Sequence, residues 1–100
     1  MSFCRTSIVE FNTEADADVF MADYNSNFES MFPEAESVMT SKISPNLYLN
    51  STIFANMEDM EKTGSGARQA LLDKNKDCLK LVSTHVGEVT ISSNSKVQGR

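Results

Sequence analysis

The fold of this chain is decided by residues 3–32, which read FCRTSIVEF, then NT, then EADADVFMADYNSNFESMF. Apolar residues occupy both alternating faces of residues 3–11: Phe3, Val9 and Phe11 on the odd face and Cys4 and Ile8 on the even face. A period of two predicts a β-strand, and apolar residues on both faces indicate that both faces are covered.

Residues 14–32 have the period of an α-helix. Thr13 is suited to the N-cap, and Asp16, three residues later, completes a variant of the capping box. Pro33 ends the helix, because the residue before a proline is disfavoured in the α region. The apolar stripe consists of Ala17, Phe20, Met21, Tyr24, Phe28, Met31 and Phe32.

The middle of the chain reads as a β-hairpin. Residues 37–44 and 47–55 are rich in strand-forming residues, and Ser44-Pro45-Asn46 between them is typical of a turn. In the second run, apolar residues again fall on both faces.

The last part is predicted to be a broken helical region followed by a strand. Asn56 is a suitable N-cap for a helix from Met57, and Thr63–Gly66 interrupts that helix. Helical stretches are expected over 67–74 and 77–83, and the final strand over 85–92.

The element order is therefore β-α-β-β-α-β, an α+β fold of the ferredoxin-like type. It predicts a four-stranded antiparallel sheet with helices on one face. Because the strands carry apolar residues on both sides, the second face needs a cover. A second copy of the chain is the economical cover, so we expect a homodimer whose two sheets form a barrel.

Length, composition and charge limit the classes of function that the chain can have. A chain of 100 residues with 40% apolar and 23% charged residues predicts a single domain over 1–100, with an ordered core at about 3–92. The net charge of −5 and the scattered basic residues argue against nucleic-acid and anionic-membrane partners. No apolar run is long enough to cross a bilayer, and no secretory signal is seen, so a cytoplasmic location is expected.

The chain resembles the dimeric α+β barrel superfamily of ferredoxin-like proteins, which contains small cofactor-free monooxygenases. The resemblance covers about residues 3–92 and rests on the element order, the long first helix and a strand containing HVGEV at 85–89. It implies the fold and the dimer. No catalytic residue is carried over, because no active-site motif aligns with this sequence.

Candidate catalytic residues are His85, Tyr24 and Tyr48, which could transfer protons to and from a substrate. His85 is the single histidine, and a single histidine is more often structural or exposed than functional. No metal and no cofactor is expected: two cysteines are too few for iron–sulfur ligation.

An apolar ligand pocket is the second candidate site, since large flexible side chains adapt to a guest. The alternative for every one of these residues is ordinary core packing. The proposed lining is Phe20, Met21, Tyr24, Phe28, Met39, Tyr48 and Phe54.

The segment TGSGAR at 63–68 is a third feature, because backbone amides and Arg68 at a helix start can hold an anion. It lacks the lysine and the spacing of a phosphate-binding loop, which favours a simple helix break.

Three functions remain open from the sequence. The first is a homodimer that binds a small apolar, fatty-acid-like molecule between helices and sheet. The second, from the enzyme class, is a cofactor-independent monooxygenase or isomerase of the dimeric α+β barrel type. The third is a structural or regulatory dimer without a ligand.

Overall fold

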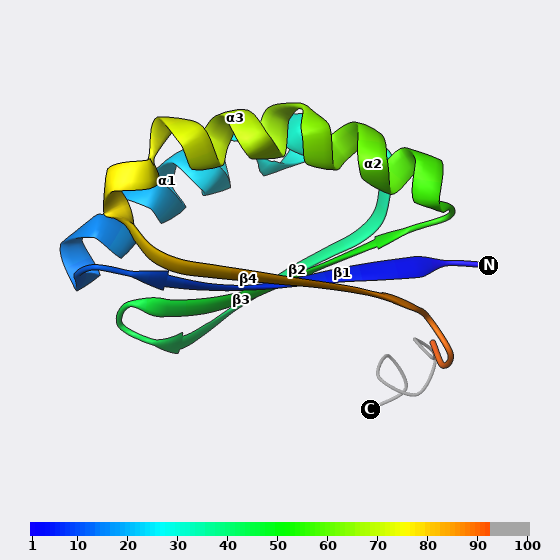
Figure 1. Ribbon diagram of the computed structural model, residues 1–100, viewed down its shortest axis with the longest axis horizontal. Coiled ribbons are helices and arrows are strands. Elements are labelled where there is room, and N and C mark those ends of the chain that lie inside the picture. The colour runs from blue at the N-terminus through cyan, green and yellow to red at the C-terminus, as the bar shows by residue number, and fades with distance from the viewer. Residues whose placement is uncertain (93–100) are drawn as a thin grey trace.

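The computed structural model describes residues 1–92 of the chain. The helices all lie on one side of a single sheet, so the molecule has two layers (Figure 1). The elements in chain order are β1 (Phe3–Phe11), α1 (Glu14–Met31), β2 (Ala35–Ser44), β3 (Leu47–Phe54), α2 (Met57–Ser65), α3 (Ala67–Lys74), the short 3-10 helix η1 (Lys76–Cys78) and β4 (Leu79–Glu88).

The sheet has the strand order β2-β3-β1-β4, and every neighbouring pair is antiparallel. β1 is a central strand: its first residue, Phe3, lies opposite Phe54 of β3 and Glu88 of β4. This arrangement confirms the predicted ferredoxin-like α+β fold with helices on one face. The register shifts near both ends of the β2–β3 pair, between Ala35 and Ser37 and between Lys42 and Ser44.

The helix starts follow the predicted caps. The Thr13 side chain accepts a hydrogen bond from the Asp16 backbone N–H at 3.1 Å, and Asn56 accepts one from the Asp59 N–H at 2.8 Å. The predicted interruption of the second helical region lies at Gly66, between α2 and α3. A Cβ at Gly66 would approach the Lys62 carbonyl oxygen to 3.3 Å, a tight contact that glycine avoids.

The prediction of 85–92 for the last strand was wrong at both ends, because β4 spans Leu79–Glu88. β4 begins at Leu79 and not at His85, and residues 79–83 are extended rather than helical. Leu79 lies opposite Phe11 and Val82 opposite Val9, so residues 79–83 pair with the C-terminal part of β1, residues 8–11. A helix there would leave the backbone groups of β1 without a ladder partner, a cost that outweighs local helix propensity.

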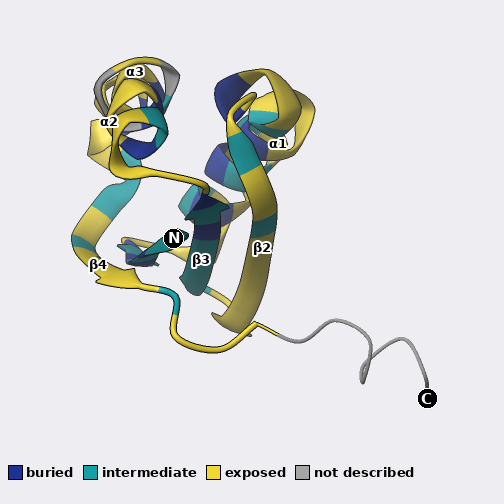
Figure 2. Cartoon of the chain, turned by 90° about the vertical axis from the view of Figure 1, so that its right-hand side faces the viewer, coloured by how far each residue is buried: buried dark blue, intermediate teal, exposed yellow. Residues whose placement is uncertain are grey.

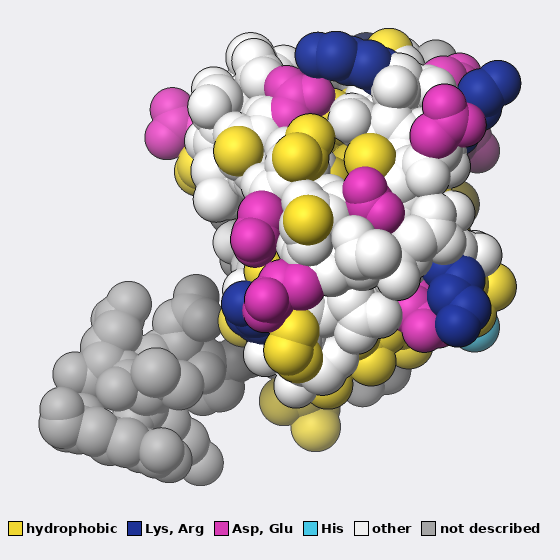
Figure 3. Space-filling model, turned by 90° about the vertical axis from the view of Figure 1, so that its left-hand side faces the viewer, with side chains coloured by type: hydrophobic (Ala, Val, Ile, Leu, Met, Phe, Trp, Pro, Cys, Tyr) yellow, Lys and Arg dark blue, Asp and Glu magenta, His cyan; other side chains and the backbone are white. Residues whose placement is uncertain are grey.

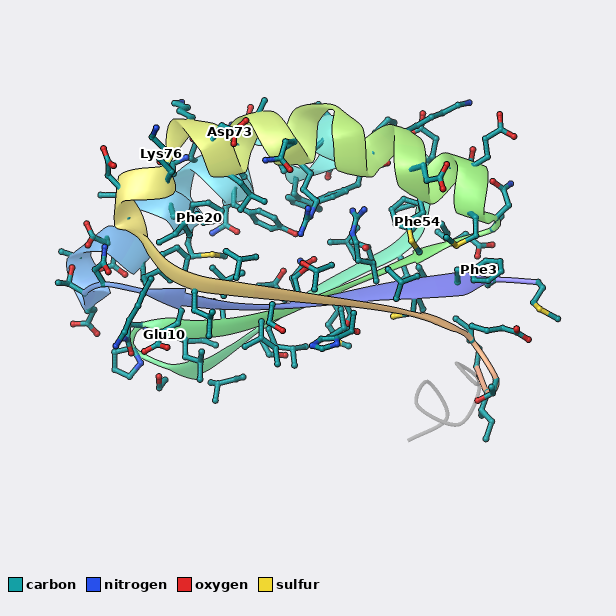
Figure 4. All side chains as sticks on the ribbon, in the orientation of Figure 1. Phe3, Glu10, Phe20, Phe54, Asp73 and Lys76 are labelled. Atoms are coloured by element: carbon teal, nitrogen blue, oxygen red, sulfur yellow. The ribbon has the colours of Figure 1, made fainter. Side chains whose placement is uncertain are left out.

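The core lies between the helices and the sheet (Figure 2). Phe11, Ala17 and Phe54 have no exposed surface, and Phe20 and Phe54 both lie in the layer between helices and sheet in Figure 4. The opposite sheet face carries no helix, and we call it the open face. Its central strands present half-buried apolar side chains: Cys4, Ile8, Leu47, Leu49 and Ile53.

Candidate functional site

The candidate site is a pocket between α1, α3 and the helix-facing side of the sheet. Its cavity has a volume of about 50 Å³ and its walls are almost entirely apolar. Aromatic and aliphatic side chains from every layer form these walls: Val9, Phe11, Phe20, Phe32, Tyr48 and Leu71.

Aromatic rings in contact fix the apolar half of the pocket. The Phe11 ring lies 5.1 Å from the Phe20 ring and 5.9 Å, edge-on, from the Tyr48 ring. The Tyr24 ring lies 6.1 Å from Phe32 and 6.5 Å from Phe20. Tilted, edge-on and offset-stacked pairs at these distances are favourable, so these contacts stabilise the packing of this half of the pocket.

A row of polar side chains crosses the sheet at the floor of the pocket, and we call it the polar row. It consists of Thr40 on β2, Asn50 on β3, Ser7 on β1 and Thr84 on β4, which lie side by side in the ladder. Thr40, Asn50 and Ser7 line the cavity. Polar groups in an apolar cavity are the usual means of orienting a ligand.

At the β2–β3 side the polar row is bonded to helix α1. The Asn50 side-chain amide donates to the Tyr24 hydroxyl oxygen at 2.5 Å and to the Thr40 hydroxyl oxygen at 2.8 Å. The Thr40 hydroxyl donates to the Tyr24 oxygen at 3.5 Å. The polar end of an otherwise buried tyrosine is thereby held at the cavity.

At the β4 side the polar row is bonded to helix α3. The Arg68 guanidinium donates to the hydroxyl oxygens of Ser7 at 3.2 Å and Thr84 at 3.1 Å. Burial lowers the pKa of Arg68. Both partners are neutral, so these bonds bring no counter-charge to Arg68, which is half-exposed.

A second arginine, Arg5, is buried on the same face of β1. It is 6% exposed, its guanidinium carbon lies 5.4 Å from the centre of the Phe54 ring, and its Nη1 donates to the Met60 carbonyl oxygen at 3.3 Å. Burial, together with the charge of Arg68, lowers the pKa of Arg5 to about 10, so it remains charged at neutral pH. Its Nη2 is buried without a hydrogen-bond partner among the described residues.

The structure brings four of the seven proposed lining residues to the cavity: Phe20, Met21, Tyr24 and Tyr48. The other three lie elsewhere. Phe28 stacks behind Tyr24 at 6.4 Å, Phe54 is fully buried beneath Arg5, and Met39 is 60% exposed and opposite Ser51 on the open face. The sheet period of two separates Met39 from its neighbours Val38 and Thr40.

The three candidate catalytic residues do not form one group. Tyr24 and Tyr48 line the cavity, whereas His85 lies on the open face, opposite Thr6. The His85 side chain is exposed, and its Nε2 lies 2.8 Å from the Ser83 hydroxyl oxygen. The whole sheet therefore separates His85 from the two tyrosines.

Sequence reasoning missed Arg5, Ser7 and the polar row. It placed Arg68 at a helix start where an anion could be held, but favoured a simple helix break there. A signal was present in β1, where Arg5 and Ser7 interrupt the apolar odd face of Phe3, Val9 and Phe11. Charged residues are almost never buried unless a partner is present, so this interruption marks a site.

The charged surface is mixed at the end of the molecule where β1 ends and α1 begins. Figure 3 shows acidic side chains spread among apolar ones there, with Lys and Arg at the margins. Glu10, below the sheet in Figure 4, pairs with Lys80 at 3.5 Å, and Asp23 pairs with Lys74 at 3.2 Å. Within residues 1–92, no helix is long and apolar enough to cross a membrane, and no three metal-ligating side chains cluster.

Proteins of known structure share this architecture. No protein-family model matches the sequence. A search of curated proteins also found no match. Solved structures match over nearly the whole chain. The fold is ferredoxin-like.

Three of the similar structures illustrate the match. A protein of unknown function from Nitrosomonas europaea has a TM-score of 0.78 at 15% identity, covering 93% of both chains. A dimeric ferredoxin-like protein from an uncultured marine organism has a TM-score of 0.75 at 13% identity, covering 94% of this chain and 93% of its own. SnoaB, a cofactor-independent oxygenase from Streptomyces nogalater, has a TM-score of 0.70 at 8% identity, covering 91% of this chain and 95% of its own.

Proposed function

We propose that this protein is a homodimer in which each subunit binds a compact, mostly apolar small molecule in the pocket between helices and sheet. The observation that carries the proposal is the polar row on the floor of an aromatic cavity. Ser7 is buried in the middle of this row, Asn50 and Arg68 are half-buried, and Thr40 is exposed. Apolar packing alone has no need of polar side chains against an aromatic cavity, because a polar group taken out of water is costly unless it is hydrogen-bonded.

The cavity volume limits the ligand. At about 50 Å³ it is far below the ~300 Å³ of a common ligand pocket, so it does not accommodate a long fatty-acid chain as it stands. Flexible Met21, Met31 and Leu72 side chains line it and can change rotamer. A ligand of one or two rings is therefore favoured over the long acyl chain expected from the sequence.

The dimer is supported by the open face. Its half-buried centre is flanked by exposed apolar side chains: Met39 is 60% exposed and Leu81 is 57% exposed. A four-stranded sheet of this composition is stabilised when a second sheet covers it. The dimeric ferredoxin-like protein of similar fold supports the same assembly.

Native mass spectrometry of the purified protein tests both parts, because it reports the subunit count and any co-purified molecule together. We expect a dimer of 11.1 kDa chains. In a thermal-shift series, 2-naphthol should raise the melting temperature, since a ligand that binds the folded state stabilises it by mass action. A flat response to naphthols, indoles and short acids, in a protein that carries no small molecule, would contradict the pocket.

The second candidate function is cofactor-independent oxygenation of an aromatic substrate. Its specific support is the pair of tyrosines at the cavity, with the Tyr24 oxygen held by Asn50, together with the fold shared with the oxygenase SnoaB. In such a reaction O₂ is the oxidant. A methylene carbon between rings loses two hydrogens and gains one oxygen as a carbonyl, and the second oxygen atom leaves as water.

In this reading the tyrosines position the substrate and move its proton. An oxygen electrode with anthrone as substrate measures the activity. We expect Tyr24→Phe to lower the rate at least tenfold and His85→Ala to leave it unchanged, because His85 lies on the other face of the sheet. No oxygen uptake by the wild type would reject the oxygenase and leave the binding proposal in place.

A further inference from the structure

The helix-facing side of β1 holds two positive charges without a counter-charge. Arg5 and Arg68 form no ion pair among residues 1–92, where Lys74 pairs with Asp23 and Lys80 with Glu10. Arg5 is buried and Arg68 is half-exposed. A buried charge is expensive unless an opposite charge accompanies it, and a like charge nearby increases the cost.

Arg68 lines the pocket, whereas Arg5 lies outside its lining, over the Phe54 ring. Arg68 donates to Ser7, and Arg5 lies two residues from Ser7 on the same face of the strand, a separation of roughly 7 Å along β1. The charge of Arg68 acts on the pKa of Arg5. Arg5 also keeps one buried N–H group, Nη2, without an acceptor among the described residues.

The pocket is therefore graded along β1. Phe11 and Val9 lie in its apolar half, Ser7 belongs to the polar row, and Arg5 lies beyond. A molecule with an apolar body and one anionic end matches this order. Its body would contact Phe11 and Phe20 and its anion would face Arg68.

We propose that the ligand is an aromatic or similarly compact monocarboxylic acid, whose carboxylate is bound by Arg68 at the polar row. This inference rests on the proposed binding function and specifies the ligand class of that same pocket. A planar carboxylate accepts paired hydrogen bonds from a guanidinium, and the Ser7 and Thr84 hydroxyls can reorient to donate to it. A single negative charge offsets the repulsion between the two arginines.

Two probes of the same shape test the charge requirement: 2-naphthoate and its neutral counterpart 2-naphthamide, compared by isothermal titration calorimetry at pH 7. We expect the acid to bind at least tenfold more tightly than the amide. Raising the salt concentration should weaken the binding of the acid and leave the binding of the amide unchanged. Equal affinities would overturn the carboxylate proposal while leaving the pocket intact, and no binding of either probe would overturn the pocket and this inference together.

Arg68→Gln identifies the residue responsible. Arg68 is half-exposed, so we expect the variant to fold, as checked by circular dichroism. The affinity for the acid should fall to within threefold of the affinity for the amide, and the affinity for the amide should stay unchanged. Lys62→Gln, an exposed charge on α2, is the matched control and should retain the wild-type preference. If Arg68→Gln unfolds, Arg68→Lys keeps the charge without the planar fork and should bind the acid with intermediate affinity. A folded Arg68 variant that keeps the full preference for the acid would overturn the assignment.

Discussion

The Asn50 side chain on β3 donates a hydrogen bond to the Tyr24 hydroxyl on α1, and this 2.5 Å contact ties the long helix to the centre of the sheet. Tyr24 is 8% exposed, so the bond is largely shielded from water. It is one of the few polar links between the two layers.

Tyr24→Phe should therefore lower the free energy of unfolding by about 1–2 kcal/mol, because it leaves a partly buried amide donor with one partner fewer. Urea denaturation measures the change. Tyr48→Phe is the matched control: the described residues offer the Tyr48 hydroxyl no hydrogen-bond partner, and the expected change is below ~0.5 kcal/mol. Equal effects of the two variants would show that the Tyr24 bond does not hold α1.

Phe20→Ala tests the aromatic core. Phe20 is 5% exposed and contacts the Phe11 ring, so truncation should cost about 3–5 kcal/mol of stability by leaving a cavity. Val19, its neighbour on α1, is 59% exposed, and Val19→Ala should change stability by less than ~0.5 kcal/mol. Thermal and chemical denaturation measure both changes. A larger loss of stability for Val19→Ala than for Phe20→Ala would show that the buried face of α1 is wrongly assigned.

Asp23 makes the stability of the fold depend on pH in the acid range. The hydrogen bonds from Lys74 and Asn75 lower the pKa of its carboxyl group below the ordinary value of 3.8. A carboxyl group with a lower pKa in the folded state stabilises the fold at neutral pH, and that contribution is lost as the pH falls below 3.8 and through the folded-state pKa.

Urea denaturation between pH 7 and pH 2 should show this loss, and Asp23→Asn should flatten the curve in the acid range. Asp18→Asn, on an exposed position of the same helix, removes the same charge without removing an ion pair seen in the described chain. An Asp23→Asn curve parallel to that of the wild type would contradict the role of Lys74.

Leu49→Glu tests the open face as the dimer interface. Leu49 lies beside Ile8 near the middle of that face, where a charge would be buried by a second sheet. Light scattering should report a monomer for the variant, with far-ultraviolet circular dichroism unchanged. Val19→Glu places the same charge on an exposed helix position and should remain dimeric. A Leu49→Glu protein that remains dimeric would show that the interface does not lie on the open face.

Most of the fold was predictable because local patterns and tertiary pairing agree. The stripe of α1, its Thr13 cap and the Asn56 cap needed no distant contact to be recognised. β4 was misjudged at residues 79–83, where Leu79, Leu81 and Val82 fit both a helix and a strand. Pairing with β1 decides between them, and sequence spacing alone does not contain that contact.

The candidate site was predictable only in its apolar half. Tyr24 and Phe20 follow from the helical period, but Met39 was placed on the wrong side because β2 is an edge strand whose alternation is weak. Arg68 reaches Ser7 and Thr84 from a different element, and only the packing of α3 over β1 and β4 brings them together. A row of residues that crosses four strands has no signature along the chain.

The central position of β1 also determines when the protein can fold. The first strand of the chain completes its ladder only with β4, the last strand, and so the sheet closes its longest loop at the end. Such non-local pairing slows folding relative to helical proteins of the same size. On the ribosome, β1 and α1 emerge long before β4, and until then one edge of β1 lies open to other strands. β1, the strand that contains Arg5 and Ser7, is therefore the segment that stays longest without one of its ladder partners during synthesis.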